Sequence, residues 1–503
     1  MTDPGARRGA DLWLLAATFV IAVAGLVYEL IAATASSYLV GDSITQFSLV
    51  IGVFLSSMGL GAWLSRFVQA VEKGFVSAQI ALGVIGGASA PLMFFAYAYT
   101  GDVQMVMFTL LITIGALVGM EIPLIARLLE AAGARHRFEN VLTVDYLGAL
   151  AASLLFPLVI VPMVGLMTAS LIFGALNLGV AALSAWLFWG VGLMRHAALI
   201  ALAFIAVGVG LWKAEETASA LSASLYEDEI ILSEDTPYQR IVLTRFQDRT
   251  RLFLNGAIQF DSLDERRYHE ALVHPAMSAA ARPADILILG GGDGMAAREA
   301  LRYPAVDTVT LVDLDPRVTQ LFRDNDDLAH LNDGALKDPR VAIVNEDAWA
   351  FVRDDQAQYD VIIADLPDPR TPALSKLYSR EFYTMLARRL RHDGAFVTQA
   401  GSPVFARRAF WSVAATGETG LQRPVTAYHV YVPSFGDWGF VLGSRDAPEA
   451  LHIPAGLSFL NDDAWQAARR FGADAARIEV EVNSIRDHPL IRYYQDGWAH
   501  WFR

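Results

Sequence analysis

Long uninterrupted apolar runs occupy the first 213 of the 503 residues. They cover roughly 12 to 34, 45 to 65, 76 to 99, 103 to 127, 141 to 163, 166 to 190 and 197 to 212. Most of them reach the roughly 20 residues that a helix needs to cross the hydrocarbon core of a bilayer. The pattern predicts a transmembrane domain of about seven helices over residues 1–213, with the lipid bilayer as its partner and no removable signal peptide.

The pattern of apolar positions changes after Lys213. A polar linker over 214–225 precedes two runs with strand character, "YQRIVLTRF" and "TRLFLNGAIQF", which predict antiparallel strands with a turn near 247–249. The helical pattern "LDERRYHEALVHPAMSAA" comes next. Residues 226–282 are therefore predicted to form a small β-hairpin subdomain with a lead-in helix.

Four short apolar runs then alternate with helical patterns: "DILILG", "TVTLVDLD", "RVAIVNED" and "YDVIIADL". Such alternation is typical of parallel strands joined by crossover helices, a doubly wound α/β sheet. The later runs "GAFVTQAG" and "GFVLGS" add further strands. We therefore predict a Rossmann-like domain of the methyltransferase type over 283–450, followed by a C-terminal extension over 451–503.

The net charge of −14 is carried almost entirely by the second half of the chain. Up to Lys213 there are nine Lys and Arg against ten Asp and Glu, which leaves −13 for the remaining 290 residues. This acidity argues against a nucleic-acid partner and favours a cationic ligand. The chain has no cysteine, which excludes disulfides and thiolate metal sites.

The basic residues of the short links fall on one side of the membrane if the helices alternate. They are Arg7, Arg8, Arg66, Lys73, Arg127, Arg135, Arg137 and Arg195. The positive-inside rule then places the N-terminus in the cytoplasm. Seven crossings would leave the second half outside, in conflict with the cytoplasmic substrates inferred below. A re-entrant segment would remove this conflict, and the weakest spans are the short last run and the fifth, which contains Pro157 and Pro162.

Three acids, Glu29, Glu121 and Asp145, lie inside the apolar runs. Intramembrane carboxylates are costly and usually face a bundle interior. One interpretation is a cation-binding or substrate-access site, and the other is hydrogen-bonded contact between helices. Small residues in these runs predict close helix packing: Gly59, Gly61, Gly86, Gly87, Gly115 and Gly119.

The polar residues of the predicted sheet gather at the carboxyl ends of its strands, where open α/β sheets bind ligands. These positions are Gly290 to Gly294 after the first strand, Asp313 after the second, Asp347 after the third, and Asp365 with Asp368 after the fourth. An acid after the second strand usually accepts the ribose hydroxyls of a nucleoside. Taken singly, each acid is more typical of a helix N-cap or a solvated loop than of a ligand site.

The charge of Asp293 indicates what kind of nucleoside ligand the loop would bind. A pyrophosphate or the carboxylate of S-adenosylmethionine would be repelled at this glycine-rich loop, whereas an amine would be attracted. Decarboxylated S-adenosylmethionine meets this requirement as a co-substrate, without a permanently bound cofactor or a metal. A second amine must then lose a proton to attack it, and in "DLPDP" Asp365 is the candidate base and Asp368 its partner.

Together these residues resemble the spermidine synthase family of polyamine aminopropyltransferases. The similarity runs from about Thr236 to Ser444, through "TPYQRI", "LNGAIQF", "DERRYHEALVHP", "ILGGGDG", "VDLDP", "DPRV", "ADLPDP" and "WGFVLGS". The apolar half, with "GLVYELI" and "MGLGAWLS", resembles the membrane-anchored bacterial branch. The resemblance implies a cell-membrane protein of polyamine biosynthesis, and its β-rich segment resembles one that dimerises in soluble relatives.

The resemblance also implies residue roles. The nucleoside portion of the donor would be held by Gln239, Gln259, Gly290, Gly292, Asp313, Asp347, Ala348 and Pro372. The amine portions would be held by Tyr268, His269, Asp293 and Asp368, beside a wall formed by Trp438, and Asp365 would accept the proton. The expected reaction converts putrescine to spermidine and releases methylthioadenosine.

The chain departs from the family pattern at Asp313, usually glutamate, and at Asn255, usually aspartate. It also departs at Leu366 and Pro367, usually serine or threonine, and at Phe435, usually tyrosine. Most of these positions lie near the expected acceptor pocket, so the acceptor is less well defined than the reaction. Two alternatives stay open: a methyltransferase that uses whole S-adenosylmethionine, and a polyamine transporter or sensor without turnover.

Overall fold

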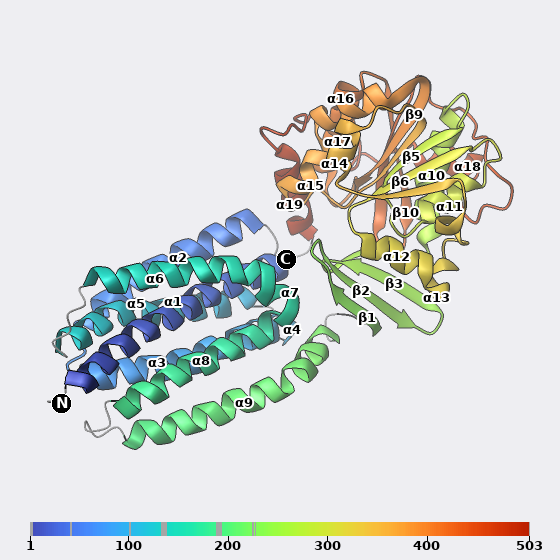
Figure 1. Cartoon of the computed structure of the whole chain (residues 1–503). Helices are drawn as coiled ribbons and strands as arrows, with labels where there is room; N and C mark the ends of the chain where they lie inside the picture. The colour runs from blue at the N-terminus through green and yellow to red at the C-terminus, as the bar shows by residue number, and fades with distance from the viewer. Residues whose placement is uncertain are drawn as a thin grey trace. The chain divides into compact units, whose positions relative to one another are not determined.

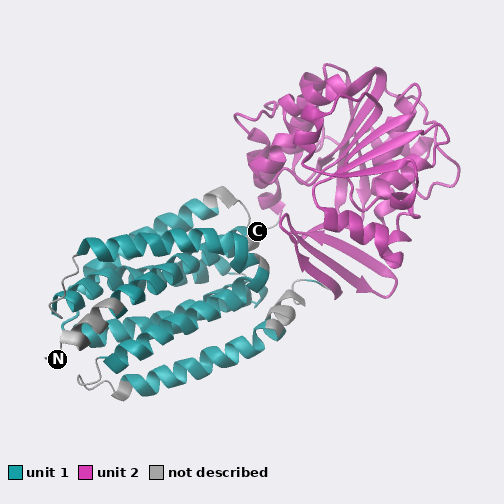
Figure 2. Ribbon diagram, viewed as in Figure 1, with its two compact units in different colours: residues 1–227 teal, residues 228–503 magenta. Residues whose placement is uncertain are grey.

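The computed structural model describes residues 4–40, 43–99, 102–131, 138–187, 194–223, 226 and 228–501. The chain divides into two compact units, Met1–Glu227 and Asp228–Arg503 (Figure 2). Of the basic residues in the topology prediction, Arg135 and Arg137 lie outside the described residues, as do the side chains of Arg7, Arg8 and Arg195.

The first unit is a bundle of helices (Figure 1). Its elements are α1 (Pro4–Val40), α2 (Ser43–Ser65), α3 (Val71–Gly87), α4 (Ser89–Tyr99), α5 (Val103–Ala131), α6 (Phe138–Leu155), the π-helical turn η1 (Phe156–Ile160), α7 (Val161–Val164), α8 (Leu166–Leu187) and α9 (Met194–Ala223). Within the described residues, seven helices are long and apolar enough to cross a membrane, as predicted. α3 and α4 count as one of them and α6 with η1 as another.

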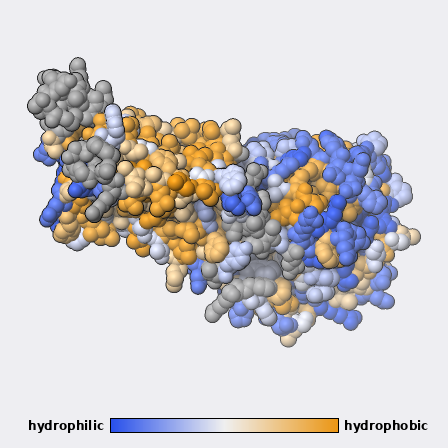
Figure 3. Space-filling model, turned by 90° about the horizontal axis from the view of Figure 1, so that it is seen from below, coloured by the Kyte–Doolittle hydropathy of each residue, from blue (hydrophilic) through white to orange (hydrophobic). Residues whose placement is uncertain are grey.

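The outer surface of this bundle is hydrophobic. Large apolar side chains are exposed on several helices, including Met105 at 71%, Leu158 at 72% and Trp212 at 81%. Figure 3 shows this surface as mostly orange, in contrast to the largely blue surface of the second unit. Exposed apolar surface of this extent is typical of helices that face lipid.

The structure corrects two details of the predicted membrane half. The helix α9 continues to Ala223, so the described part of the expected linker 214–225 is helical; its sequence "AEETASALSA" contains no Gly or Pro to end the helix. Gly59 has no atom near its missing side chain, whereas a Cβ on Gly61 or Gly119 would overlap the facing backbone of α5 or α2. Close packing therefore explains Gly61 and Gly119 but not Gly59.

The second unit begins with an antiparallel sheet, β1 (Glu229–Asp235), β2 (Arg240–Phe246), β3 (Arg249–Leu254) and β4 (Ala257–Asp261), in the order β1-β2-β3-β4. The strand β1 is absent from the prediction. The run "TRLFLNGAIQF" forms two strands, because Asn255 and Gly256 have φ of 51° and 78°. Two successive left-handed residues are what a tight hairpin turn requires.

A seven-stranded sheet follows, in the order β10-β11-β9-β8-β5-β6-β7. Its strands are β5 (Asp285–Gly290), β6 (Thr308–Asp313), β7 (Val341–Asn345), β8 (Tyr359–Asp365), β9 (Leu390–Gly401), β10 (Val425–Val432) and β11 (Gly436–Gly443). β5 to β9 pair in parallel, and β11 pairs antiparallel with β9 and β10. The Rossmann-like prediction is confirmed, and β10 is an additional edge strand.

Helices cover both faces of this sheet (Figure 1). They are α10 (Glu265–Ala279), α11 (Met295–Leu301), α12 (Pro316–Asp324), α13 (Asp326–Ala329), η3 (Ala335–Lys337), α14 (Ala348–Asp354), α15 (Pro372–Ser375), η4 (Lys376–Tyr378), α16 (Arg380–Arg389), α17 (Arg407–Leu421), α18 (Asp462–Ala468) and α19 (Pro489–Trp501). Alternate residues of β5 enter different cores: Ile286 and Ile288 on one face, Leu287 and Leu289 on the other. This alternation explains why the strand is continuously apolar.

The order of the strands reverses at β5. β6 and β7 continue to one side of β5, and β8 and β9 return to its other side. Gly290 and Asp365, the last residues of β5 and β8, are register partners at this point. A topological switch point of this kind opens a crevice at the carboxyl ends of the strands.

Candidate active site

The glycine-rich loop after β5 brings the ends of β5, β6 and β8 close together. Gly290 has φ of 81°, and a Cβ there would overlap the backbone carbonyl of Asp365. Gly292 donates its N–H to Asp313 Oδ2 at 3.0 Å, where a Cβ would lie 2.7 Å from the same atom. The absence of side chains therefore lets the main chain of Asp365 and the carboxylate of Asp313 approach the loop.

Asp365 receives two neighbours from the lead-in helix α10. The Tyr268 hydroxyl donates to its Oδ1 at 2.6 Å, and His269 Nε2 lies 3.9 Å from its Oδ2. Burial, followed by the charge of Asp365, raises the pKa of Tyr268 well above its ordinary value. Tyr268 therefore stays protonated and acts as a hydrogen-bond donor to the carboxylate.

His269 is fixed by a buried ion-pair chain. Its Nδ1 lies 2.9 Å from Glu265 Oε2, and Arg298 donates to both oxygens of Glu265 at 2.9 Å. Burial opposes the charged imidazole, but the hydrogen bond and charge of Glu265, with smaller contributions from Asp293 and Asp365, raise the pKa of His269 to about 9. The site therefore holds an imidazolium at neutral pH.

Asp293 is a buried acid within the loop, and Asp313 is a half-buried acid beside it. Burial is the main cause that raises the pKa of each of them to about 6. Asp293 accepts the Met295 N–H at 2.9 Å, and its proton affinity is lowered by His269 and raised by Asp365. Asp313 accepts the N–H groups of Gly292 and Asp315. A cationic ligand would supply the positive charge that these carboxylates lack.

Asp368 is oriented from two other parts of the chain. Tyr494, on the C-terminal helix α19, donates its hydroxyl to Asp368 Oδ2 at 2.6 Å, and Gln399 Nε2 lies 3.3 Å from Oδ1. Between Asp365 and Asp368, the Tyr378 hydroxyl donates to the carbonyls of Leu366 and Pro367 at 2.9 and 3.1 Å. The loop that carries both acids is therefore held by side chains as well as by β8.

An aromatic wall adjoins the acids. The ring centroids of Trp438 and Phe435 are 5.1 Å apart, and those of Phe435 and Tyr268 are 5.7 Å apart. Trp438 is 8% exposed, and its indole N–H has no hydrogen-bond acceptor among the described residues. The aromatic wall therefore contains a buried indole donor and adjoins Asp365 through Tyr268.

The remaining predicted residues have local partners. Gln239 Nε2 donates to Asp315 Oδ2 at 3.1 Å, and Gln259 Nε2 donates to the carbonyl of Ala257. Asp347 lies two residues beyond the end of β7, where its Oδ1 caps α14 and its Oδ2 pairs with Lys376 at 3.1 Å. Ala348 and Pro372 are the first residues of α14 and α15. Among the described residues, none of these side chains hydrogen-bonds to Asp365, Tyr268 or His269.

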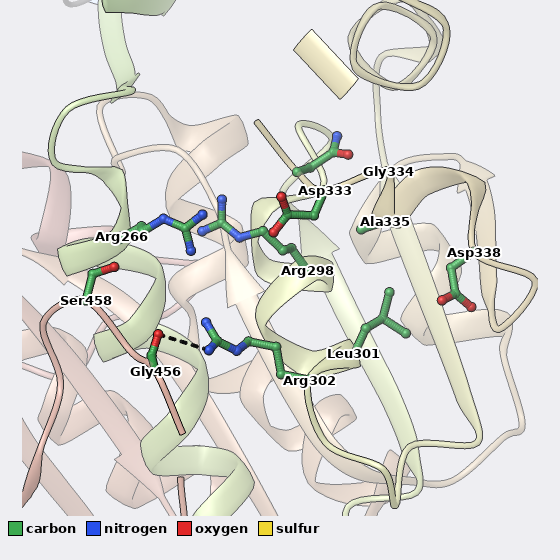
Figure 4. Close-up of a pocket in the computed structure, with 11 residues that line it drawn as sticks. Arg266, Arg298, Leu301, Arg302, Asp333, Gly334, Ala335, Asp338, Gly456 and Ser458 are labelled. Carbon is green, nitrogen blue, oxygen red and sulfur yellow. Dashed lines mark hydrogen bonds between the residues drawn. The ribbon is translucent and has the colours of Figure 1, made fainter. Parts of the chain in front are cut away.

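A cleft of about 620 Å³ lies on the outer side of the ion-pair chain (Figure 4). Arg266, Arg298 and Arg302 line it, and their positive charge is compensated by Glu265 and Glu299. Arg302 also donates to the carbonyl of Gly456, the dashed line in Figure 4. These guanidinium groups already have carboxylate partners, so the positive charge that lines the cleft is balanced within the protein.

Comparison with known proteins identifies the family. A model of the spermine/spermidine synthase domain matches residues 265–450. A polyamine aminopropyltransferase of Leptospira interrogans is 41% identical over 492 residues, which cover 96% of this chain and 98% of that protein. The chain belongs to the polyamine aminopropyltransferase family. Polyamine aminopropyltransferase 2 of Ralstonia nicotianae is 42% identical over 516 residues, with 98% and 99% coverage.

A solved spermidine synthase in complex with the transition state analogue AdoDATO is also similar to this aminopropyltransferase family member. It is 25% identical, with a TM-score of 0.45, and covers 48% of this chain and 86% of that chain. The relatives from Leptospira and Ralstonia match nearly the whole chain, so they include the apolar half. The resemblance to this family that the sequence motifs indicate is confirmed.

The sequence analysis did not predict four residues that orient the acids and the histidine of this site: Glu265, Arg298, Gln399 and Tyr494. Glu265 and His269 are four residues apart on one helix, a spacing that brings side chains together and is a usable signal. Tyr494 is 126 positions from Asp368 and outside the matched domain. No local pattern indicates such a partner.

Proposed function

We propose that the protein transfers the aminopropyl group of decarboxylated S-adenosylmethionine to putrescine, forming spermidine and methylthioadenosine. The observation that carries this proposal is the group of carboxylates, Asp293, Asp313, Asp365 and Asp368, around a glycine-rich nucleoside loop. Such a site favours a donor that carries a sulfonium and an ammonium but no carboxylate. Membership of the polyamine aminopropyltransferase family supports the same reaction.

The chemical step joins the acceptor nitrogen to the carbon next to the sulfonium. The amine lone pair forms the C–N bond, and the electrons of the breaking C–S bond go to sulfur, which leaves as a neutral thioether. An alkylamine has a pKa near 10.4, so its neutral form costs on the order of 4 to 5 kcal/mol at pH 7. Asp365 accepts the proton that the amine loses, and the Tyr268 hydrogen bond holds Asp365 in line.

The other residues hold the two substrates in this proposal. Asp313 accepts from the ribose hydroxyls, and Gly290 and Gly292 keep the loop open to the donor. Gln239, Gln259, Asp347, Ala348 and Pro372 surround the rest of the nucleoside. Asp293 binds the aminopropyl ammonium of the donor, and Asp368 binds the ammonium of the acceptor. His269 orients Asp365. Trp438 packs against the methylene groups of the acceptor.

The test is an incubation of the purified full-length protein with decarboxylated S-adenosylmethionine and putrescine, with methylthioadenosine and spermidine measured by chromatography. Both products should form in equal amounts. Asp365→Asn should lower kcat by about 10²- to 10⁴-fold, as loss of a general base does. Asp354→Asn, at an exposed acid paired with Arg353, is the matched control and should retain activity. Methyl transfer from intact S-adenosylmethionine, without aminopropyl transfer, would contradict the proposal.

We also propose that the apolar helices anchor the protein in the bacterial cell membrane with its catalytic unit in the cytoplasm, where the substrates are made. The seven membrane-long helices support insertion. With seven full crossings a cytoplasmic catalytic unit requires an N-terminus outside the cell, whereas with one re-entrant segment both ends lie in the cytoplasm. The expected result is that protease cleaves the second unit in inverted vesicles and spares it in intact cells. Cleavage in intact cells would place the unit outside instead.

A further inference from the structure

The C-terminal helix α19 reaches the acceptor end of the candidate site. Leu490, Tyr493 and Tyr494 of this helix are each at most 5% exposed and belong to the core on one face of the sheet. The Tyr494 hydroxyl lies 2.6 Å from Asp368 Oδ2. An ionised carboxylate only accepts, so the hydroxyl is the donor, and this length is typical of a hydrogen bond to a charged oxygen.

The two oxygens of Asp368 have different surroundings. Oδ2 accepts from Tyr494 and lies 3.5 Å from Arg370, whose guanidinium is 5.6 Å from the centre of the Tyr494 ring. Oδ1 has the longer contact of 3.3 Å to Gln399. Oδ2 is therefore committed to the protein, and Oδ1 retains more capacity to accept from a ligand.

The segment before α19 supports the same loop independently. Asn483, which is fully buried, donates through Nδ2 to the carbonyls of Ser375 and Tyr378 at 3.0 and 3.1 Å. Tyr378 in turn donates to the carbonyl of Leu366. The C-terminal extension thus holds the segment between Asp365 and Asp368 directly through Tyr494 and indirectly through Asn483 and Tyr378.

We propose that Tyr494 is a positioning residue for the acceptor amine. By holding Oδ2, it turns Oδ1 of Asp368 toward the ammonium of a diamine acceptor and thereby sets how tightly that acceptor binds. This inference rests on the proposed aminopropyl transfer. It assigns part of the acceptor site to a helix outside the matched domain 265–450.

A double-mutant cycle on the full-length protein tests this role. Tyr494→Phe keeps the buried ring and removes only the hydroxyl, so we expect KM for putrescine to rise about 10- to 100-fold, the usual effect of losing a hydrogen bond to a charged group. KM for decarboxylated S-adenosylmethionine should stay within about twofold. On an Asp368→Asn background, Tyr494→Phe should have almost no further effect, because it acts through the Asp368 carboxylate.

The matched control is Tyr493→Phe, which removes the neighbouring hydroxyl that donates to Glu481 at 2.8 Å. It should leave both KM values unchanged. Equal effects of Tyr494→Phe on both substrates, or multiplicative effects of Tyr494→Phe and Asp368→Asn, would overturn the inference. If Tyr494→Phe does not fold, Asp368→Glu displaces the same carboxylate and should raise KM for putrescine. Absence of turnover in the wild type would overturn the proposed function and this inference together.

Discussion

Gly290 and Asp365 are register partners at the ends of β5 and β8, and a Cβ on Gly290 would overlap the backbone carbonyl of Asp365. The main chain that carries the proposed base is therefore in contact with the main chain of the glycine-rich loop. The position of the Asp365 carboxylate depends on the absence of a side chain at Gly290.

Gly290→Ala is expected to damage both stability and activity. The left-handed φ of 81° costs about 1 to 2 kcal/mol for alanine, and the overlap with Asp365 adds about 1 to 3 kcal/mol. A shift of Asp365 should also lower kcat about 100-fold. The control is Gly334→Ala, at φ of 71° with no atom within 4 Å of the new Cβ, which should lose about 1 to 2 kcal/mol and no activity. If Gly290→Ala and Gly334→Ala lowered the unfolding temperature and kcat by equal amounts, this explanation would be contradicted.

Donor binding should weaken in acid. The pKa values of Asp293 and Asp313 are each about 6, so both carboxylates become protonated as the pH falls below 6 and no longer attract a cation. The plot of log kcat/KM for decarboxylated S-adenosylmethionine against pH, at saturating putrescine, should fall below pH 6 with a slope of up to two. Asp293→Asn should reduce this slope by one and Asp354→Asn should not. An unchanged slope in Asp293→Asn would assign the titration to other groups.

The stability of the second unit should decrease between pH 6.5 and 9. His269 has a pKa of about 9 in the folded protein, above the value near 6.5 of an unfolded chain. Its charged form therefore stabilises the fold fully below pH 6.5, and this contribution is lost as the pH rises through 9. The loss is on the order of 3 kcal/mol. Chemical unfolding followed at several pH values should show it in the wild type and not in Glu265→Gln or His269→Gln.

The membrane half should tolerate larger residues at Gly59 but not at Gly119. A Cβ on Gly119 would overlap the backbone of Met58 on the facing helix, whereas Gly59 has nothing within 4 Å. Gly119→Val should therefore separate α2 from α5 and lower the unfolding temperature in detergent by several degrees, an effect of about 1 to 3 kcal/mol. Gly59→Val should leave the unfolding temperature within about a degree of the wild-type value. Equal shifts would mean that α2 and α5 do not pack at Gly119.

The sequence determined the architecture because each element has a pattern of its own. Seven long apolar runs specify helices, because a helix in lipid forms all of its backbone hydrogen bonds within itself. Short apolar runs spaced by helical patterns specify a parallel sheet. The chain direction of such a sheet also brings the strand ends together, so the sequence predicted that Asp313 and Asp365 would lie at the same edge. Their motifs indicated the family as well, since "GGGDG" and "DLPDP" carry the chemistry locally.

Only the tertiary structure decided which groups orient the charged side chains of the site. Tyr494 reaches Asp368 across 126 positions, and Arg298 reaches Glu265 across 33. Helix packing fixes such contacts, and periodicity within one segment carries no information about a partner in another. The same limit explains Asn255 and Gly256, where a hairpin turn divides one apolar run into two strands. Local pattern specifies elements and their ends, whereas the packing of those elements specifies what each side chain touches.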